Sequence, residues 1–438
     1  MESKESSFER LTDDVLMKIV SFVAFKDMPS LRCTSKRLNS ICGQQLLSRS
    51  VLVNEGFFDF KQQCYLYENG IFNKEMKIRL TYAKMLNLLK KTLPNVRSLA
   101  LVAVDGLFDE NVHIIGEYLP NLQNLFIFEK NDHLKDSGLS RLFPKCPNLQ
   151  RVWIHGIGLD GSCFKSLSKI TYFSYMPYYN SFIETIDLTM LVSSLQTLRI
   201  HSKNHFSFPK HFLPHCDHLK SLSIPIFDET QFATILNNIS VVGRVSKLGV
   251  AIHFQLESEL LQTLLPNHAI KNLSFKFLSF VSTENIGELL QRFPNVEHLC
   301  LKLKRPGNHS RNEVVDINQL LSIISNVQRL QTLELCVRKE HNAKSLRINT
   351  LLSLLNIERL RDLQIGYLWA EEVNEIIACV QDYYSQRSDK RVKISLIIGD
   401  KATVFVPSAN IAFNLIDRIS RHGYYASQCA LSVAISFV

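Results

Sequence analysis

The densest group of side chains that could bind a metal ion lies between residues 201 and 218. It consists of His201, His205, His211, His215, Cys216 and His218. Two of the histidine pairs are four residues apart, a spacing that places two metal ligands on one face of a helix. Pro209 and the phenylalanines around it interrupt any continuous helix there. We therefore expect no metal site, and no other feature of the sequence indicates a cofactor.

The motifs of common enzyme active sites are absent from the sequence. There is no P-loop, dinucleotide-binding glycine fingerprint, GxSxG elbow or HExxH pair. Gly399-Asp400-Lys401 lacks the surrounding glycines of a phosphate-binding loop, and no pattern pairs carboxylates for acid–base chemistry. The sequence therefore predicts no catalytic residues and a protein that is not an enzyme.

Composition and charge narrow the class of protein further. The chain has 438 residues, of which 46% are hydrophobic and 21% charged, as in ordinary globular proteins. Its ten cysteines are scattered without a CxxC pair, which indicates reduced thiols. We find no signal-peptide pattern, and no apolar run is long enough to span a membrane. These features predict a cytoplasmic or nuclear protein with no membrane contact. The net charge of +9 comes without a dense Lys/Arg run, so we expect no nucleic-acid partner.

A repeated pattern of apolar residues, apolar-x-x-apolar-x-apolar, runs through most of the chain. Between Val96 and Val296 it recurs in eight steps of about 25 residues, within the range of leucine-rich repeats. The eleven occurrences are Val96/Leu99/Leu101, Leu122/Leu125/Ile127, Leu149/Val152/Ile154, Ile170/Phe173/Tyr175, Leu195/Leu198/Ile200, Leu219/Leu222/Ile224, Val245/Leu248/Val250, Ile270/Leu273/Phe275, Val296/Leu299/Leu301, Leu330/Leu333/Leu335 and Leu360/Leu363/Ile365.

Each occurrence predicts a short strand followed by a loop and a helix. The last two apolar positions are two residues apart, so both face the core. Helical spacing follows in several units, as at 286–293, where Thr283 is the expected N-cap, and at 317–324. Because one such unit cannot cover its own apolar face, we expect an α/β solenoid with strands on the concave face and helices on the convex face.

Two parts of the repeat region depart from this regular pattern. The polar stretch 304–311 predicts a long loop, and a similar insertion follows Leu335. After about residue 400 the pattern weakens, although Leu431, Val433 and Ile435 have the spacing of a last strand. We interpret 401–438 as a C-terminal cap, because the open end of a solenoid requires cover.

Residues 8–42 do not share the repeat and predict three short helices. Val15, Leu16 and Ile19 have helical spacing behind two aspartates, whose charges favour a helix N-terminus. A second helix is expected to begin at Asp27, and a third to include Ile41 and Cys42. Three short helices hold little core, so an exposed apolar stripe on them is a candidate docking face. We call this segment the hook.

The order of residues in the hook closely resembles the F-box family. The match includes Leu11, Asp13-Asp14-Val15-Leu16, Lys26-Asp27 and Ser35-Lys36-Arg37. The stretch 134–149, with Cys146-Pro147-Asn148-Leu149, is similar to the cysteine-containing leucine-rich repeats of many F-box proteins. The resemblance implies binding to a Skp-family adaptor and, through it, to a cullin. The residues implied to pack inside the hook or against the adaptor are Leu11, Val15, Leu16, Ile19, Phe22, Val23, Met28 and Leu31.

The strand residues between the inward positions are candidates for binding a target protein. The candidates are Phe126, Phe128, Trp153, His155, Tyr172, Arg199, His201, Lys276 and Lys302. The same pattern also places five other side chains outward, those of Asn124, Arg151, Thr197, His298 and Cys300. Aromatic side chains and arginine are frequent anchors of protein interfaces. An aromatic zone that passes into a basic one predicts a target with apolar and acidic features.

The sequence thus predicts four segments and one leading function. The segments are an F-box at 1–48, a linker with a first atypical repeat at 49–92, leucine-rich repeats at 93–400 and a cap at 401–438. The function is that of a non-catalytic substrate receptor in an SCF-type ubiquitin ligase. The alternative is a leucine-rich-repeat scaffold that acts outside a ubiquitin ligase.

Overall fold

The structure is a computed structural model, and it divides into two compact units, Met1–His218 and Leu219–Val438. It describes residues 11–21, 30–31, 33–48, 50–55, 62–68, 71–77, 97–102, 107–128, 133–177, 186–201, 212–303, 316–337, 346–368, 375–376, 378–380, 382–383, 392–398, 412–416 and 431–436. No helix within these ranges combines the length and the apolarity that crossing a membrane requires.

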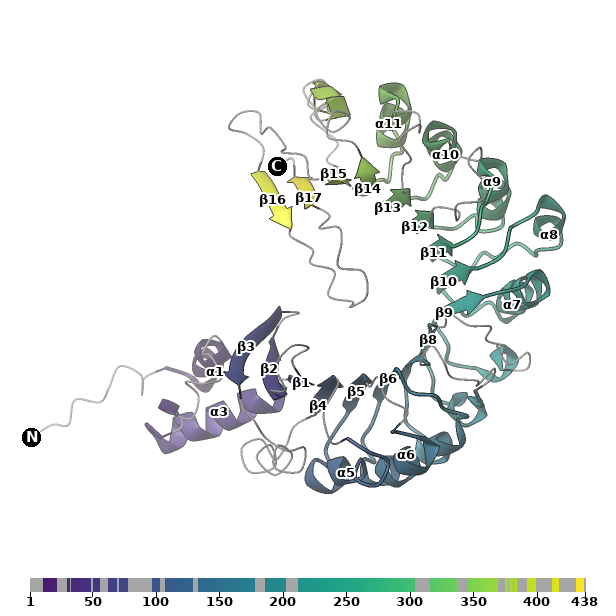
Figure 1. The fold of residues 1–438 in the computed structure, drawn as a ribbon. Helices are drawn as coiled ribbons and strands as arrows, with labels where there is room; N and C mark the ends of the chain where they lie inside the picture. The colour runs from purple at the N-terminus through teal and green to yellow at the C-terminus, as the bar shows by residue number, and fades with distance from the viewer. Residues whose placement is uncertain are drawn as a thin grey trace, which may run out of the picture. The chain divides into compact units, whose positions relative to one another are not determined.

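The first unit places a row of parallel strands beside a layer of helices (Figure 1). Strands β4 to β8 pair in parallel in chain order, and β1 pairs in parallel with β4 and antiparallel with β2, which also pairs antiparallel with β3. The strands are β1 (Ser50–Glu55), β2 (Gln62–Glu68), β3 (Ile71–Lys77), β4 (Ser98–Val102), β5 (Asn124–Phe128), β6 (Arg151–His155), β7 (Tyr172–Met176) and β8 (Thr197–Ile200).

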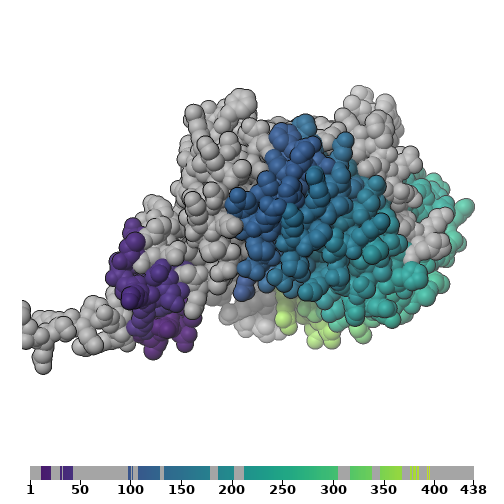
Figure 2. All heavy atoms as spheres, turned by 90° about the horizontal axis from the view of Figure 1, so that it is seen from below, coloured from purple at the N-terminus to yellow at the C-terminus, as the bar shows by residue number. Residues whose placement is uncertain are grey.

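The helical elements of the first unit are mostly short. In Figure 2 the described residues of the first unit that follow β4 lie side by side on one surface, blue to teal. The elements are α1 (Asp13–Ser21), α3 (Lys36–Ser48), α5 (Ile114–Tyr118), α6 (Asp136–Leu142) and the 3₁₀ helices η2 (Phe143–Lys145), η3 (Ser162–Ser166), η4 (Thr189–Leu191) and η5 (Leu213–His215).

The second unit has the same strand–helix order with longer helices. Strands β9 to β15 pair in parallel in chain order, and β17 pairs antiparallel with β15 and β16. The strands are β9 (Ser221–Ile226), β10 (Lys247–Ile252), β11 (Asn272–Phe277), β12 (His298–Leu303), β13 (Thr332–Val337), β14 (Asp362–Leu368), β15 (Lys393–Ile398), β16 (Ala412–Ile416) and β17 (Leu431–Ser436). The helices are α7 (Glu229–Val242), α8 (Ser258–Gln262), α9 (Thr283–Gln291), α10 (Ile317–Ile324) and α11 (Ile348–Leu355).

All eleven strands predicted from the repeat are present, as β4 to β14. The two inward residues of each strand are at most 3% exposed, so the predicted register is confirmed. Equivalent residues pair across neighbouring strands, as Leu273 pairs with Leu299 and Phe275 with Leu301. The last predicted strand, around Val433, is β17. Repetition of one buried apolar pair per strand therefore builds a solenoid-like core in each unit.

The connections between strands differ from the expected helices in two respects. Among the described residues, the segments that precede β7, β8 and β9 contain only the 3₁₀ helices η3, η4 and η5, and Gly161, with positive φ, is the N-cap of η3. The predicted N-cap Thr283 is wrong by one residue: Ser282 caps α9, and its hydroxyl accepts a hydrogen bond from the Asn285 amide at 3.1 Å.

Several expected segments lie wholly or partly outside the described residues. These include the second helix of the hook over most of its length, the loop 304–311, the insertion after Leu335 and much of the predicted cap. The segment predicted as a linker and atypical repeat, 49–92, contains β1, β2 and β3.

Hydrogen bonds to two half-buried carboxylates connect successive repeats of the first unit. The Asp109 carboxylate accepts from the amides of Lys135 and Gly138, at 3.0 and 2.7 Å, and from the Ser137 hydroxyl. The Asp136 carboxylate then accepts from three amides of the following repeat. Loop amides that no helix or strand can pair thus find acceptors in the preceding repeat.

Candidate functional site

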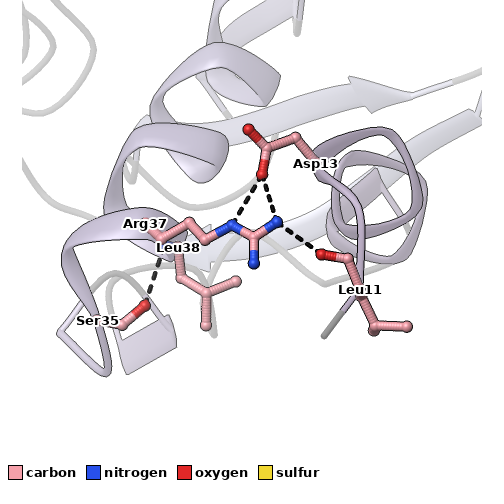
Figure 3. A network of polar contacts seen from close by, with 5 residues as sticks. All are labelled: Leu11, Asp13, Ser35, Arg37 and Leu38. Carbon is pink, nitrogen blue, oxygen red and sulfur yellow. Dashed lines mark hydrogen bonds and ion pairs between the residues drawn. The ribbon is translucent and has the colours of Figure 1, made fainter. Parts of the chain in front are cut away.

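The described part of the hook includes α1 and the start of α3, which Arg37 connects through hydrogen bonds (Figure 3). The Arg37 guanidinium donates to the Asp13 carboxylate from Nε, at 2.8 Å, and to the Leu11 carbonyl from Nη2, at 2.6 Å. The Leu38 amide donates to the Ser35 hydroxyl at 3.1 Å where α3 begins. One side chain from the start of α3 therefore fixes the start of α1.

Burial divides the apolar residues of α1 into an inner and an outer group. Leu16 and Val20 are each 1% exposed and pack within the hook, where Ile41 and Cys42 of α3 are also buried. Val15 is 44% exposed and Ile19 37%, and they lie on one face because they are four residues apart. The helix thus presents an apolar pair that the hook itself does not cover.

The structure places the implied adaptor-binding residues in three groups. Leu16 is internal, Val15 and Ile19 are exposed, and Leu11 and Leu31 are half-buried. Phe22, Val23 and Met28 lie outside the described residues.

The outward side chains of β5 to β8 form a continuous group, which we call the aromatic face: Phe126, Phe128, Arg151, Trp153, His155, Tyr172, Arg199 and His201. The Trp153 and Tyr172 rings lie 4.6 Å apart between centroids. The Arg151 guanidinium lies over both rings, 5.6 Å from the Trp153 centroid and 5.3 Å from that of Tyr172. The Arg199 guanidinium lies 5.7 Å from the Tyr172 centroid. Aromatic rings and guanidinium groups therefore alternate across three neighbouring strands.

His155 joins the phenylalanines of β5 to this group. The His155 ring is edge-on to the rings of Phe126 and Phe128, with ring centroids 5.4 and 6.5 Å apart. The His155 and His201 ring centroids lie 6.3 Å apart. Its Nε2 lies 3.2 Å from the hydroxyl of Ser174, which is only 2% exposed. The seven predicted target-binding residues of the first unit are thus neighbours on one face.

The two predicted target-binding lysines belong to the second unit. Lys276 of β11 and Lys302 of β12 are opposite each other in the strand register, and both are exposed. Lys302 forms an ion pair with Glu334 at 2.8 Å. Burial alone would lower the pKa of Lys302, but the hydrogen bond to Glu334, the largest of several opposing effects, contributes to a pKa that is raised. Its charge is therefore partly satisfied within the chain.

Two residues on this side of the strands make contacts that the sequence did not indicate. Arg151 was an outward position without an assigned contact, yet it lies over two rings. Ser174 was not singled out, although its position between the inward Phe173 and Tyr175 places it on the same face. The alternation of the strand could have identified both residues, but the ring contacts depend on side-chain conformation.

The described residues provide no set of metal ligands. No three His, Cys, Asp or Glu side chains among them converge, and the Cys216 thiol instead donates to the Phe212 carbonyl at 3.4 Å. His205 and His211 lie outside the described residues. Burial raises the pKa of Cys146 and of Cys216 to about 12, so neither thiol is a nucleophile near neutral pH. None of the eight cysteines with described side chains forms a disulfide bond.

Comparison with known proteins identifies one domain. The family model of the F-box domain matches residues 8–49, so the chain contains an F-box. No curated protein is similar to the chain at a significant level. Among solved structures, the chain is similar to one from the yeast Rad7 and Elc1 complex, with 14% identity, a TM-score of 0.43 and coverage of 85% of this chain and 86% of that chain. A structure from the Drosophila Toll–Spatzle complex shows 11% identity, a TM-score of 0.28 and coverage of 65% and 49%.

Proposed function

We propose that this protein is the substrate-recognition subunit of an SCF-type ubiquitin ligase. Its F-box would bind a Skp-family adaptor and, through it, a cullin. The observation that carries this proposal is the F-box at 8–49, whose first helix exposes Val15 and Ile19. An exposed apolar pair on a small helical domain is a typical docking element.

The repeats would supply the second binding surface. We assign them as leucine-rich repeats because their period of about 25 residues and their buried pairs of apolar strand residues are typical of that class. The aromatic face would bind the protein target, since neighbouring aromatic and arginine side chains on a layer of strands suit a protein interface.

The contribution of this subunit to ubiquitin transfer would be proximity. By holding target and ligase together, it would convert an encounter between two molecules into a step within one complex. The chain would need no catalytic residue for this role. The ubiquitinated target would then be degraded by the proteasome in the cytoplasm or nucleus.

Capture of a purified Skp-family adaptor by the full chain tests the first half of the proposal. We expect Val15→Asp combined with Ile19→Asp to reduce capture at least tenfold, because the charges would replace the exposed apolar pair. Val241→Asp is the matched control, since Val241 is 77% exposed on α7, outside the F-box. A wild-type chain that never captures adaptor would favour the alternative, a repeat scaffold outside a ubiquitin ligase.

Co-purification of cellular proteins with the proteasome inhibited tests the second half. Trp153→Ala combined with Phe126→Ala should remove the target from the purified complexes while adaptor capture persists. An unchanged set of bound proteins would show that the aromatic face is not the target site.

A further inference from the structure

Two guanidinium groups on the aromatic face have rings as neighbours but no acidic partner. Arg151 lies over Trp153 and Tyr172, and Arg199 lies over Tyr172. Among the residues that the structure describes, neither guanidinium forms an ion pair. Both arginines are exposed, so a partner molecule can reach them.

The strands around these arginines supply no compensating charge. The sequences of β4 to β8 contain no Asp, Glu or Lys, whereas in the second unit Lys302 pairs with Glu334 and Lys271 with Glu297. The aromatic face is therefore positively charged, and its charge is complementary to an acidic partner.

Contact with the rings also restricts where the guanidinium groups can lie. The N–H groups that point away from the rings form a planar fork, which matches a carboxylate in a bidentate geometry. Because the rings restrict both arginine side chains, little conformational entropy remains to be lost when a carboxylate binds.

The positions of the arginines favour two separate anions over one. Arg151 lies on β6 and Arg199 on β8, and β7 separates these strands, so their Cα atoms are roughly 10 Å apart or more. A single phosphate group would need donors that converge on one point, and the strands offer no lysine to complete such a site. Two carboxylates on one chain suit this spacing better.

We propose that the aromatic face binds a protein segment with two acidic side chains next to an apolar one. One carboxylate would bind Arg151 and the other Arg199, and the apolar side chain would contact Trp153 and Phe126. This inference rests on the proposed function, because it names the chemistry of the target at the same face.

Binding of labelled peptides to the full chain tests the proposal. The probes are fluorescein-labelled nonapeptides of Gly and Ser that carry two Asp residues, one to four positions apart, with a Leu beside them. Matched peptides replace both Asp by Asn, or one Asp by phosphoserine. Fluorescence anisotropy is measured with the wild-type chain, with Arg151→Gln combined with Arg199→Gln, and with Lys165→Gln combined with Lys169→Gln. The two lysines are exposed near η3 and control for the loss of two positive charges.

We expect at least one Asp spacing to bind, the Asn peptide to bind at least tenfold more weakly, and the arginine variant to lose at least tenfold in affinity. The lysine variant should stay within twofold of wild type, and circular dichroism should show both variants folded. Absence of binding by every Asp peptide, equal binding of the Asn peptides, or an unaffected arginine variant would overturn the proposal. Phosphopeptides that bind more than tenfold better than the Asp peptides would overturn it in favour of phosphate recognition.

The same preparations separate this inference from the proposed function. If adaptor capture and Trp153-dependent target capture persist while the Asp peptides fail to bind, the acidic-segment inference is wrong and the receptor function stands. If adaptor capture fails, the receptor function is wrong whatever the peptides do.

Discussion

Gly161 and Gly243 both adopt positive φ, but their surroundings differ. A Cβ on Gly161 would lie 2.2 Å from the Asp187 carbonyl oxygen, whereas a Cβ on Gly243 would meet nothing nearer than 4.0 Å. We expect Gly161→Ala to lower the free energy of unfolding by about 2–5 kcal/mol, because backbone strain adds to the clash with Asp187. Gly243→Ala should lower it by about 1–2 kcal/mol, because only backbone strain acts there. Urea denaturation measures both. Equal losses would show that the close approach of Gly161 to Asp187 does not contribute.

Asp136 is a second residue on which the first unit depends. Its carboxylate accepts from the amides of Asp160, Gly161 and Cys163 at 2.9, 3.1 and 3.2 Å. Asp136→Ala would leave these amides without their acceptor, at a cost of about 1.5–3 kcal/mol of unfolding free energy. Asp136→Asn should cost less, because one amide oxygen can still accept.

The matched control for Asp136 is Glu110→Ala, which removes a negative charge at an exposed position in the same unit. Its effect in the same denaturation experiment should stay within about 0.5 kcal/mol. If both substitutions cost the same, the charge and not the hydrogen bonding of Asp136 is responsible.

The elements that the sequence predicts well are those whose side chains repeat at a fixed spacing. Each strand from β4 to β14 has its inward pair two residues apart, and that period is enough to locate the strand and its buried face. The 3₁₀ helices η3, η4 and η5 lack a comparable period, so the spacing of apolar residues does not predict them. Whether Ser282 or Thr283 caps α9 depends on one hydroxyl orientation, which spacing does not determine.

The contact between α1 and α3 gives a prediction at the scale of the element. Arg37 and Asp13 are both largely exposed, with side chains 39% and 68% accessible, so solvent screens their ion pair. We expect Arg37→Ala to destabilise the start of α1 by less than about 1 kcal/mol. Amide hydrogen exchange at Leu16, whose amide donates to the Thr12 carbonyl, measures the change. A loss of several kcal/mol would mean that Arg37 is essential to the hook.

The two proposed binding surfaces of the molecule differ in how far the sequence determines them. The residue order of the hook predicted the F-box that the family model matches at 8–49. Alternation along the strands predicted which side chains share the aromatic face, and Trp153 and Tyr172 do lie together. Alternation could not predict that the guanidinium groups of Arg151 and Arg199 lie over the Tyr172 ring, because that contact depends on side-chain rotamers and neighbouring strands. The identity of a target depends on such details.

If the chain acts by proximity, both surfaces must work in the same molecule. A lysine-bearing carrier protein fused to the best-binding Asp peptide should be ubiquitinated by a reconstituted ligase that contains the wild-type chain. The Val15→Asp/Ile19→Asp variant should lower transfer to background by losing the adaptor, and the Arg151→Gln/Arg199→Gln variant should do so by losing the peptide. Val241→Asp should transfer at the wild-type rate. Transfer that survives either surface variant while the corresponding binding is lost would show that the chain does not act by bridging carrier and ligase.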